Sequence, residues 1–280
     1  MRLGSTYFVR KHAIGADSSA VLRRQADDME RLSYLSPSLV PRITNRHQTA
    51  TEMWFDMDYL ENYQELWRFD QATVERVVTR VLAKLSSTVY CYSAPVNGKA
   101  WLAELLSDKV YPRLGCPLAS ATTVTIDGVV HRGLRTLLAL ELPDGIAPHL
   151  RRPIHGDMTL ENILYNENTD DVKLIDPAGA RHVDASELDV GKLFQSLLGD
   201  YELLKGKPDL VRRVSEFEFE LPHGPKELSC SRVHFLGDAN WKPGLFYIAV
   251  AFIRMVPYMR KLSEQRAQFA LLMAVKALST

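Results

Sequence analysis

The chain has 280 residues, enough for one large domain or two lobes with a sizeable core. Its composition is that of a globular protein, with 46% hydrophobic and 24% charged residues. Lysine plus arginine and aspartate plus glutamate number 34 each, so no overall charge draws the chain to nucleic acid or to an anionic membrane. Any phosphate site must therefore be local.

Three further features bear on the class of protein. Cys91, Cys116 and Cys230 are scattered and form no C-x-x-C pair, which argues against a disulfide framework or a thiolate zinc site and suits a reducing cytoplasm. The first residues lack the apolar core of a signal peptide. The most apolar stretch, 245–256, contains Arg254 and is too short to span a bilayer, so it predicts a buried helix.

The first sixty residues predict a small β-rich lobe. Residues 5–13 are rich in strand-forming side chains, and residues 17–35 have helical spacing with Asp17, Ser18 or Ser19 as the N-cap. A hairpin that turns at Asn45-Arg46 follows, and in its second strand Met53, Phe55 and Met57 alternate on one face.

After a connector over 57–62 the pattern becomes mainly helical. The expected elements are helices over 72–90 and 99–111, a hairpin over 122–130 with an Asp127-Gly128 turn, a short helix over 134–142, and helices from Ser186 onward that break at Pro208, at 221–225 and at Pro257. We therefore expect an α+β chain with a reduced N-lobe over 1–60 and a helical C-lobe over 61–280.

The segment "PIHGDMTLENILYNENTDDVKLIDPAGAR", residues 153–181, carries the clearest chemistry. Asp157 is followed five positions later by Asn162, the apolar strand "NILY" and a second strand, "VKLI", which delivers Asp176 at its end. One carboxylate to orient a nucleophile, with an amide oxygen and a second carboxylate to hold Mg²⁺ against phosphates, is the arrangement that phosphoryl transfer requires.

The pattern H-x-D-x-x-x-x-N followed by a strand-end aspartate resembles that of protein kinases. The version "HGDMTLENIL…LIDP" is similar to the aminoglycoside phosphotransferase/choline kinase-like family, the small-molecule branch of that fold. Thr159 stands where protein serine/threonine kinases usually carry lysine, and Pro177-Ala178 follows Asp176 in place of Phe-Gly. Asp189 follows so soon after Asp176 that little room remains for an activation segment.

The resemblance implies a bilobal protein-kinase-like fold and Mg²⁺-ATP-dependent phosphorylation of a hydroxyl group. It makes Asp157 the catalytic base, His155 an orienting residue, and Asn162 and Asp176 the Mg²⁺ ligands. Asp189 becomes a structural acid that braces the catalytic loop at a helix start. An ordinary helix N-cap is the alternative for Asp189.

For the nucleotide, the family pattern needs a strand lysine with an acidic partner on the next helix. Lys11 closes the strand "YFVRK", and Asp28 is the favoured partner, with Glu30 as the competitor. For either acid an exposed helix charge is the plain alternative.

The segment "FDMDYLEN" resembles the hinge, where backbone groups around Asp58, Tyr59 and Leu60 would meet adenine. A simple strand-end loop is the alternative.

One expected part is missing, because no G-x-G-x-x-G hairpin precedes the lysine strand, where Gly4 is the only glycine. Either the nucleotide is covered differently, or an upstream domain or partner chain completes the N-lobe, or the sequence is truncated, or the protein does not bind ATP productively. The order of the short motifs over 5–202 also resembles phosphotransferase modules encoded in bacterial polysaccharide-biosynthesis clusters.

The acceptor site would lie in "HFLGDANWKPGLFY", where Asp238 and Trp241 suit an amine or a sugar face. A helix-connecting loop with a core tryptophan is an equal alternative. The sequence thus predicts an enzyme that phosphorylates a sugar, polyol or amino alcohol. The competing hypotheses are a non-catalytic kinase-like module that binds a nucleotide or partner protein and, third, a protein kinase.

Overall fold

The structure is a computed structural model that describes residues 2–3, 6–139, 146–148, 150–178, 183–205, 207, 209–224 and 241–280. It mixes helices with several small sheets, which confirms the predicted α+β class. The chain divides into two compact units, one made of 1–94 and 151–189 and the other of 95–150 and 190–280. Each unit is a set of residues that contact one another more than they contact the rest of the chain. This division does not test the predicted lobe boundary near residue 60, which stays a prediction.

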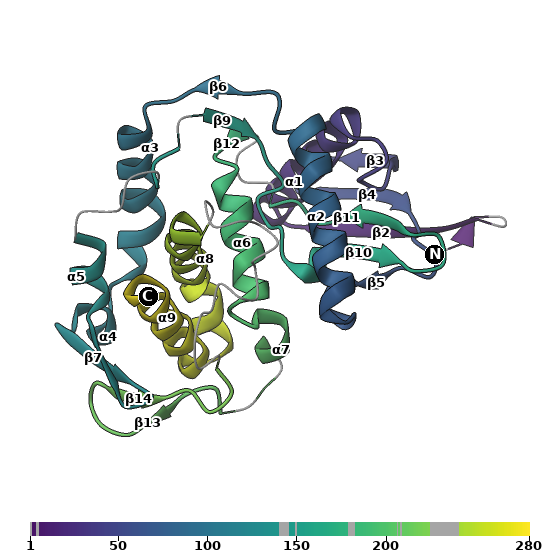
Figure 1. The fold of residues 1–280 in the computed structure, drawn as a ribbon. Helices are drawn as coiled ribbons and strands as arrows, with labels where there is room; N and C mark the ends of the chain where they lie inside the picture. The colour runs from purple at the N-terminus through teal and green to yellow at the C-terminus, as the bar shows by residue number, and fades with distance from the viewer. Residues whose placement is uncertain are drawn as a thin grey trace. The chain divides into compact units, whose positions relative to one another are not determined.

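The first unit holds the N-terminal elements and the polar motif (Figure 1). Its elements are β1 (Arg2–Leu3), β2 (Thr6–Ile14), α1 (Ala16–Leu35), β3 (Ile43–Gln48), β4 (Glu52–Asp58), β5 (Gln64–Glu65), a 3-10 turn (Leu66–Arg68), α2 (Gln71–Thr88), β9 (Leu150–Pro153), a second 3-10 turn (Leu160–Asn162), β10 (Ile163–Asn166), β11 (Asp171–Leu174) and β12 (Val183–Asp184).

The second unit is mainly helical. Its elements are α3 (Gly98–Leu105), a π-helical turn (Leu106–Val110), a 3-10 turn (Tyr111–Arg113), α4 (Pro117–Ser120), β7 (Thr123–Ile126), β8 (Val129–Arg132), α5 (Leu134–Ala139), α7 (Tyr201–Lys205), β13 (Arg212–Arg213), β14 (Glu218–Glu220), α8 (Trp241–Leu262) and α9 (Glu264–Ser279). Three of the described elements cross the division between the units: β6 (Ala94–Pro95), α6 (Glu187–Leu197) and, by its first residue, β9.

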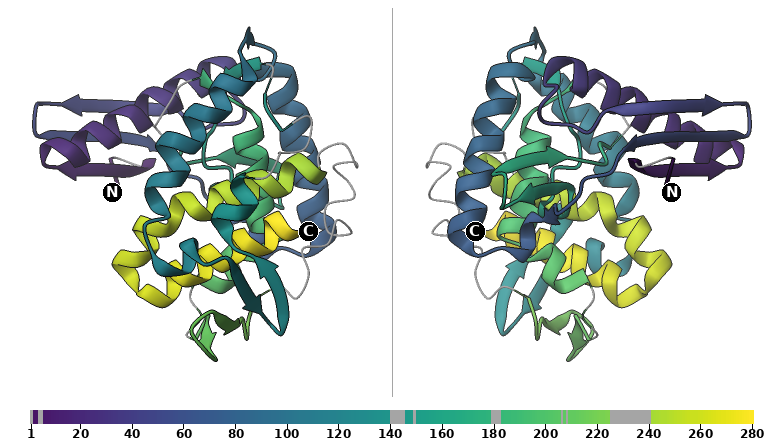
Figure 2. Two further views of the ribbon diagram at one scale, coloured as in Figure 1. Left: turned by 90° about the vertical axis from the view of Figure 1, so that its left-hand side faces the viewer. Right: turned by 90° about the vertical axis from the view of Figure 1, so that its right-hand side faces the viewer.

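The first sheet has the order β1-β2-β4-β3, with α1 against one face (Figure 2). In β4 the side chains of Met53, Phe55 and Met57 are buried, as their alternation predicts. Lys11 of β2 lies directly opposite Phe55 in the antiparallel register. Because opposed residues point to the same face of a sheet, Lys11 lies on the side that α1 covers.

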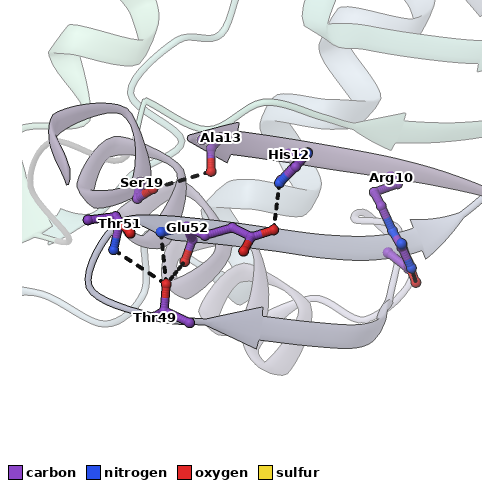
Figure 3. A network of polar contacts seen from close by, with 8 residues as sticks. Arg10, His12, Ala13, Ser19, Thr49, Thr51 and Glu52 are labelled. Carbon is purple, nitrogen blue, oxygen red and sulfur yellow. Dashed lines mark hydrogen bonds and ion pairs between the residues drawn. The ribbon is translucent and has the colours of Figure 1, made fainter. Parts of the chain in front are cut away.

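The loop between β3 and β4 covers residues 49–51, later in the chain than predicted. Asn45 and Arg46 belong to β3, and Arg46 forms ion pairs with two acids of α1. The turn is formed around Thr49, whose Oγ1 accepts hydrogen bonds from the backbone N–H groups of Thr51 (3.4 Å) and Glu52 (3.0 Å) (Figure 3). A threonine side chain can close such a turn without Asn or Gly, and the predicted Asn45-Arg46 turn is therefore wrong.

The start of α1 also differs from the prediction. Its N-cap is Gly15, with φ of +97° and no side-chain cap, so none of the three predicted residues caps the helix. Ser19 instead donates its hydroxyl hydrogen to the Ala13 carbonyl at 3.3 Å (Figure 3). A left-handed glycine turns the chain directly from β2 into the helix.

The second sheet of this unit, with the order β11-β10-β5, presents the polar motif and lies beside α2 (Figure 1). At the β10–β11 turn, Asp170 accepts hydrogen bonds from Arg76 and Arg80 of α2 and from the Tyr165 hydroxyl, each at 2.8 Å. Through these bonds, led by the one from Arg76, the pKa of Asp170 falls to about 2. This turn is therefore anchored on a helix.

In the second unit the predicted β7–β8 hairpin is confirmed, with Asp127 and Gly128 at φ of +52° and +80°. The Asp127 carboxylate accepts from the Leu221 backbone N–H (2.8 Å) and from Lys276 of α9 (3.3 Å). The sheet with the order β13-β14-β7-β8 is thus held against the last helix.

The stretch 245–256 lies in α8 and is largely buried, as predicted. The helix continues through Pro257, where a break was expected. An internal proline costs about 3 kcal/mol, and packing along α9 offsets that cost. Pro208, where another helix break was expected, lies outside the described residues. Among the described helices, none has an apolar stretch of the length that a membrane span requires.

The anchored turn makes a pH-dependent prediction. The folded-state pKa of Asp170 lies below its ordinary value of 3.8. The ionised carboxylate therefore stabilises the fold above about pH 4, and this contribution is lost as the pH falls toward 2. We expect Asp170→Asn to lower the free energy of unfolding at pH 7, with a deficit that shrinks toward pH 2 in urea titrations.

Asp209→Asn is the matched control, since Asp209 is also exposed and also has a left-handed backbone. It should show no such pH-dependent deficit. A deficit of Asp170→Asn that stays constant from pH 7 to pH 2 would contradict the assignment.

Candidate functional site

The segment after β9 forms a tight loop that leads into β10. The Asp157 carbonyl accepts a hydrogen bond from the Thr159 N–H (2.9 Å), and the Thr159 carbonyl accepts from the Asn162 N–H (3.1 Å). These bonds close the loop over five residues, the spacing that the sequence motif requires.

Asn162 ties the loop together through its side chain. Its Nδ2 donates to the Asp157 carbonyl at 2.8 Å and to Asp157 Oδ2 at 3.2 Å. Because the amide nitrogen is used in this way, the amide oxygen is left as an acceptor or metal ligand. The Asn162 backbone carbonyl also accepts from the Ile175 N–H at 3.0 Å, which holds the loop beside the residue that precedes Asp176.

His155 connects the same two segments. Its Nε2 donates to the Ile175 carbonyl at 2.9 Å, and its own carbonyl accepts from the Ala178 N–H at 2.9 Å. Its Nδ1 accepts from the Asp157 N–H at 3.4 Å. The ring therefore spans from the loop to the strand exit, which is the geometry expected of an orienting residue.

Two residues of the motif have left-handed backbones. Asp176 has φ of +58°, a conformation that aspartate tolerates better than most residues. Gly156 has φ of +83°, and a Cβ there would lie 2.8 Å from the Cβ of Ala178. A side chain at position 156 would therefore push the loop away from the segment after Asp176.

A fully buried carboxylate holds this loop in place. Asp189 accepts hydrogen bonds from the backbone N–H groups of His155 (2.9 Å) and Gly156 (2.6 Å) and from the hydroxyl of Tyr90 (2.7 Å). Burial raises the pKa of Asp189, although these three donors favour the ionised form. Burial likewise raises the pKa of Tyr90.

These contacts decide between the two interpretations of Asp189. Helix α6 begins at Glu187, so Asp189 lies inside its first turn and is not the N-cap. Tyr90, just after the end of α2, was missed by the sequence analysis, because nothing in the local pattern indicates that its hydroxyl meets residue 189.

The structure brings Lys11 to the polar motif. Its ammonium forms an ion pair with Asp176 Oδ1 and donates to Gln25 Oε1 of α1 at 3.4 Å. The Lys11 and Asp176 side chains are 23% and 37% exposed, so a ligand can reach both. The ion pair between Lys11 and Asp176 therefore joins β2 of the first sheet to the residues that follow β11.

This arrangement corrects the predicted partner of Lys11. Asp28 pairs with Arg31 at 3.0 Å, and Glu30 pairs with Arg46 of β3 at 3.0 Å. Gln25 lies three residues before Asp28, about one helical turn nearer to the start of α1, and it is this turn that faces Lys11. A direct role of Asp28 in nucleotide binding stays a prediction.

The predicted hinge lies at the end of β4. Asp58 is the last residue of the strand, opposite Phe8, and its N–H donates to the Arg42 carbonyl at 3.2 Å. Tyr59 is 52% exposed, with its ring centroid 6.0 Å from that of Tyr7. Leu60 follows, half-buried. Backbone contact with adenine at these positions stays a prediction.

The predicted acceptor residues are not described. Asp238 lies outside the described residues, and so does the side chain of Trp241, the first residue of α8.

The donor set suits Mg²⁺. Asp176 supplies a carboxylate that already attracts a cation, and Asn162 keeps its amide oxygen. Within the described part of the chain, no three His, Cys, Asp or Glu side chains gather around a metal position. A nucleotide-bound Mg²⁺ does not need such a cluster, because waters and phosphate oxygens complete its coordination.

The chain matches no protein-family model and no curated protein. Among solved structures it is similar to a protein of Haemophilus somnus 129PT that carries the provisional name fructosamine-3-kinase. The TM-score is 0.57 at 11% identity, over 98% of this chain and 84% of the other.

A second likeness is to the GDP and kanamycin complex of APH(2")-IIia, with a TM-score of 0.56 at 13% identity, over 96% and 86% of the two chains. An aminoglycoside-3'-phosphotransferase of type VIII gives a TM-score of 0.48 at 16% identity, over 97% and 86%. The first two likenesses confirm the predicted resemblance in fold, so the chain has the protein-kinase-like α+β fold.

The buried brace is testable by mutation. We expect Asp189→Ala to lower the free energy of unfolding by about 3 kcal/mol or more, since each buried donor left without an acceptor costs about 1–3 kcal/mol. Tyr90→Phe removes one donor and leaves the two backbone bonds intact, and it should cost only about 1 kcal/mol.

Urea unfolding of both variants at pH 7 measures the two values. An Asp189→Ala protein that is no less stable than Tyr90→Phe would show that the carboxylate does not hold the loop.

Proposed function

We propose that the protein is a phosphotransferase that moves the γ-phosphoryl group of Mg²⁺-ATP to a hydroxyl group of a small molecule. The observation that carries this proposal is one constellation within one unit: Asp157 hydrogen-bonded by Asn162, and Asp176 paired with Lys11. Phosphoryl transfer is catalysed mainly by positioning and charge, and these groups supply both.

Asp157 is proposed as the residue that orients the acceptor hydroxyl and accepts its proton. Its carboxylate is held by the Asn162 amide at 3.2 Å, and its backbone is fixed by the loop that Asp189 braces. His155 keeps the loop against the strand exit. A rigid loop favours the near-attack geometry that the reaction needs.

Lys11, Asn162 and Asp176 are proposed to hold the nucleotide and its metal. When bound, Mg²⁺ would neutralise charge on the transferring phosphates. Asn162 and Asp176 would contribute oxygen ligands, and Lys11 would contact the phosphates. The pair that Lys11 and Asp176 form in the structure supports this assignment, because it places a cation suited to phosphates beside a carboxylate suited to a metal, both partly exposed.

The remaining predicted residues complete the proposal. Backbone groups around Asp58, Tyr59 and Leu60 would contact adenine, and Asp28 of α1 would contribute to nucleotide binding. Asp238 and Trp241 would contact the acceptor.

The class of acceptor is supported by the similar structures. One neighbour carries the name of a kinase of fructosamine, and another was solved with GDP and kanamycin. Both names point to nucleotide-dependent proteins whose ligands are sugar-like. We therefore propose a sugar, polyol or amino alcohol as the acceptor.

A non-catalytic kinase-like module is the second candidate, favoured by the absence of a G-x-G-x-x-G hairpin from the sequence. Such a module would bind a nucleotide or a partner protein without turnover.

The proposal is tested by transfer of label from γ-labelled ATP, with Mg²⁺, to pools of sugars, polyols and amino alcohols. Asp157→Asn keeps the shape of the side chain and removes its basicity. It should lower transfer at least about a hundredfold, the usual size of a general-base contribution, and leave the affinity for a non-hydrolysable ATP analogue unchanged.

Asp108→Asn, at an exposed position of the second unit, is the control and should keep full activity. Transfer that persists in Asp157→Asn would contradict the assigned mechanism. Nucleotide binding by the wild type with no transfer to any pool would favour the non-catalytic module.

A further inference from the structure

The side chain of Gln25 bridges the two halves of the candidate nucleotide site. Its Oε1 accepts from the Lys11 ammonium at 3.4 Å, and its Nε2 donates to the Pro177 carbonyl at 3.3 Å. Pro177 directly follows Asp176, the proposed metal ligand. One amide of α1 therefore contacts both the lysine strand and the backbone beside the aspartate.

An amide suits this position better than a carboxylate. One end must accept a hydrogen bond from an ammonium group and the other must donate to a carbonyl oxygen, and glutamine has one atom for each. A glutamate would place an oxygen against the Pro177 carbonyl oxygen, where two acceptors repel. The contacts thus explain glutamine at position 25 by its chemistry.

The neutrality of Gln25 changes the charge balance of the site. Because Gln25 carries no charge, the ammonium of Lys11 is balanced by the Asp176 carboxylate. An ammonium held at that carboxylate opposes the approach of a second cation. Lys11 would therefore compete with a Mg²⁺ ion for Asp176 as long as no nucleotide is bound.

We infer that Gln25 is a positioning residue that makes nucleotide binding and Mg²⁺ binding depend on each other. This inference rests on the proposed function. When nucleotide phosphates attract Lys11, Asp176 becomes free to hold the metal, and Gln25 keeps the Asp176–Pro177 backbone in place during the exchange. Each ligand then raises the affinity for the other by the same factor.

The test compares Gln25→Glu with Gln64→Glu, which adds the same charge at an exposed position of β5 in the same unit. Calorimetry gives the affinity of each variant and of the wild type for a non-hydrolysable ATP analogue, with and without Mg²⁺. The ratio of the two affinities is the coupling factor.

In Gln25→Glu the new carboxylate draws Lys11 away from Asp176, so that Mg²⁺ no longer needs the nucleotide to displace the lysine. We expect its coupling factor to be about five- to tenfold smaller than that of the wild type. Gln64→Glu should keep the wild-type factor.

A second readout uses protein without nucleotide. Lys11→Met and Asp176→Asn are combined in a double-mutant cycle of urea unfolding, in the wild-type and in the Gln25→Glu background. The coupling between the two positions should fall by about half or more when the carboxylate introduced on α1 competes for the ammonium.

The outcomes separate the two claims. Equal coupling factors for Gln25→Glu and Gln64→Glu, or an unchanged double-mutant cycle, would overturn the role of Gln25 and leave the proposed function standing. Binding of the analogue by the wild type that is the same with and without Mg²⁺ would overturn the proposed function as well.

Discussion

The buried carboxylate of Asp189 is the constraint on which the candidate site depends. It accepts two backbone hydrogen bonds from His155 and Gly156 and one from Tyr90, with no exposure to solvent. A buried carboxylate is costly unless its oxygens are fully hydrogen-bonded, and these three donors meet that need. In return the loop is fixed at the two residues that precede Asp157.

An ion pair connects this loop region to the first sheet. The Asn162 carbonyl and the His155 ring hold the strand exit that carries Asp176, and Asp176 pairs with Lys11. Gln25 of α1 contacts Lys11 and the backbone beside Asp176. Asp157, Asn162, Asp176 and Lys11 are thereby placed by one continuous hydrogen-bond network. The proposed phosphoryl transfer depends on such positioning.

The sequence was most informative where the signal is local. The spacing of Asp157, Asn162 and Asp176 predicted a loop and a hairpin that the structure contains, because neighbouring hydrogen bonds determine both. The partner of Lys11 was not predictable, since it depends on which turn of α1 faces β2. The β3–β4 turn was misplaced because a threonine side chain closes it, and Pro257 stays in a helix because tertiary packing outweighs its local preference.

The proposed nucleotide site is tested most directly by calorimetric binding of a non-hydrolysable ATP analogue, with and without Mg²⁺, to the wild type and to Asp176→Ala. The wild type should bind the analogue more tightly with Mg²⁺, and Asp176→Ala should lose this gain, because the aspartate proposed to hold the metal is gone. Folded Asp176→Ala protein that keeps the full Mg²⁺-dependent gain would contradict the central claim that Asp176 and Lys11 form the nucleotide site.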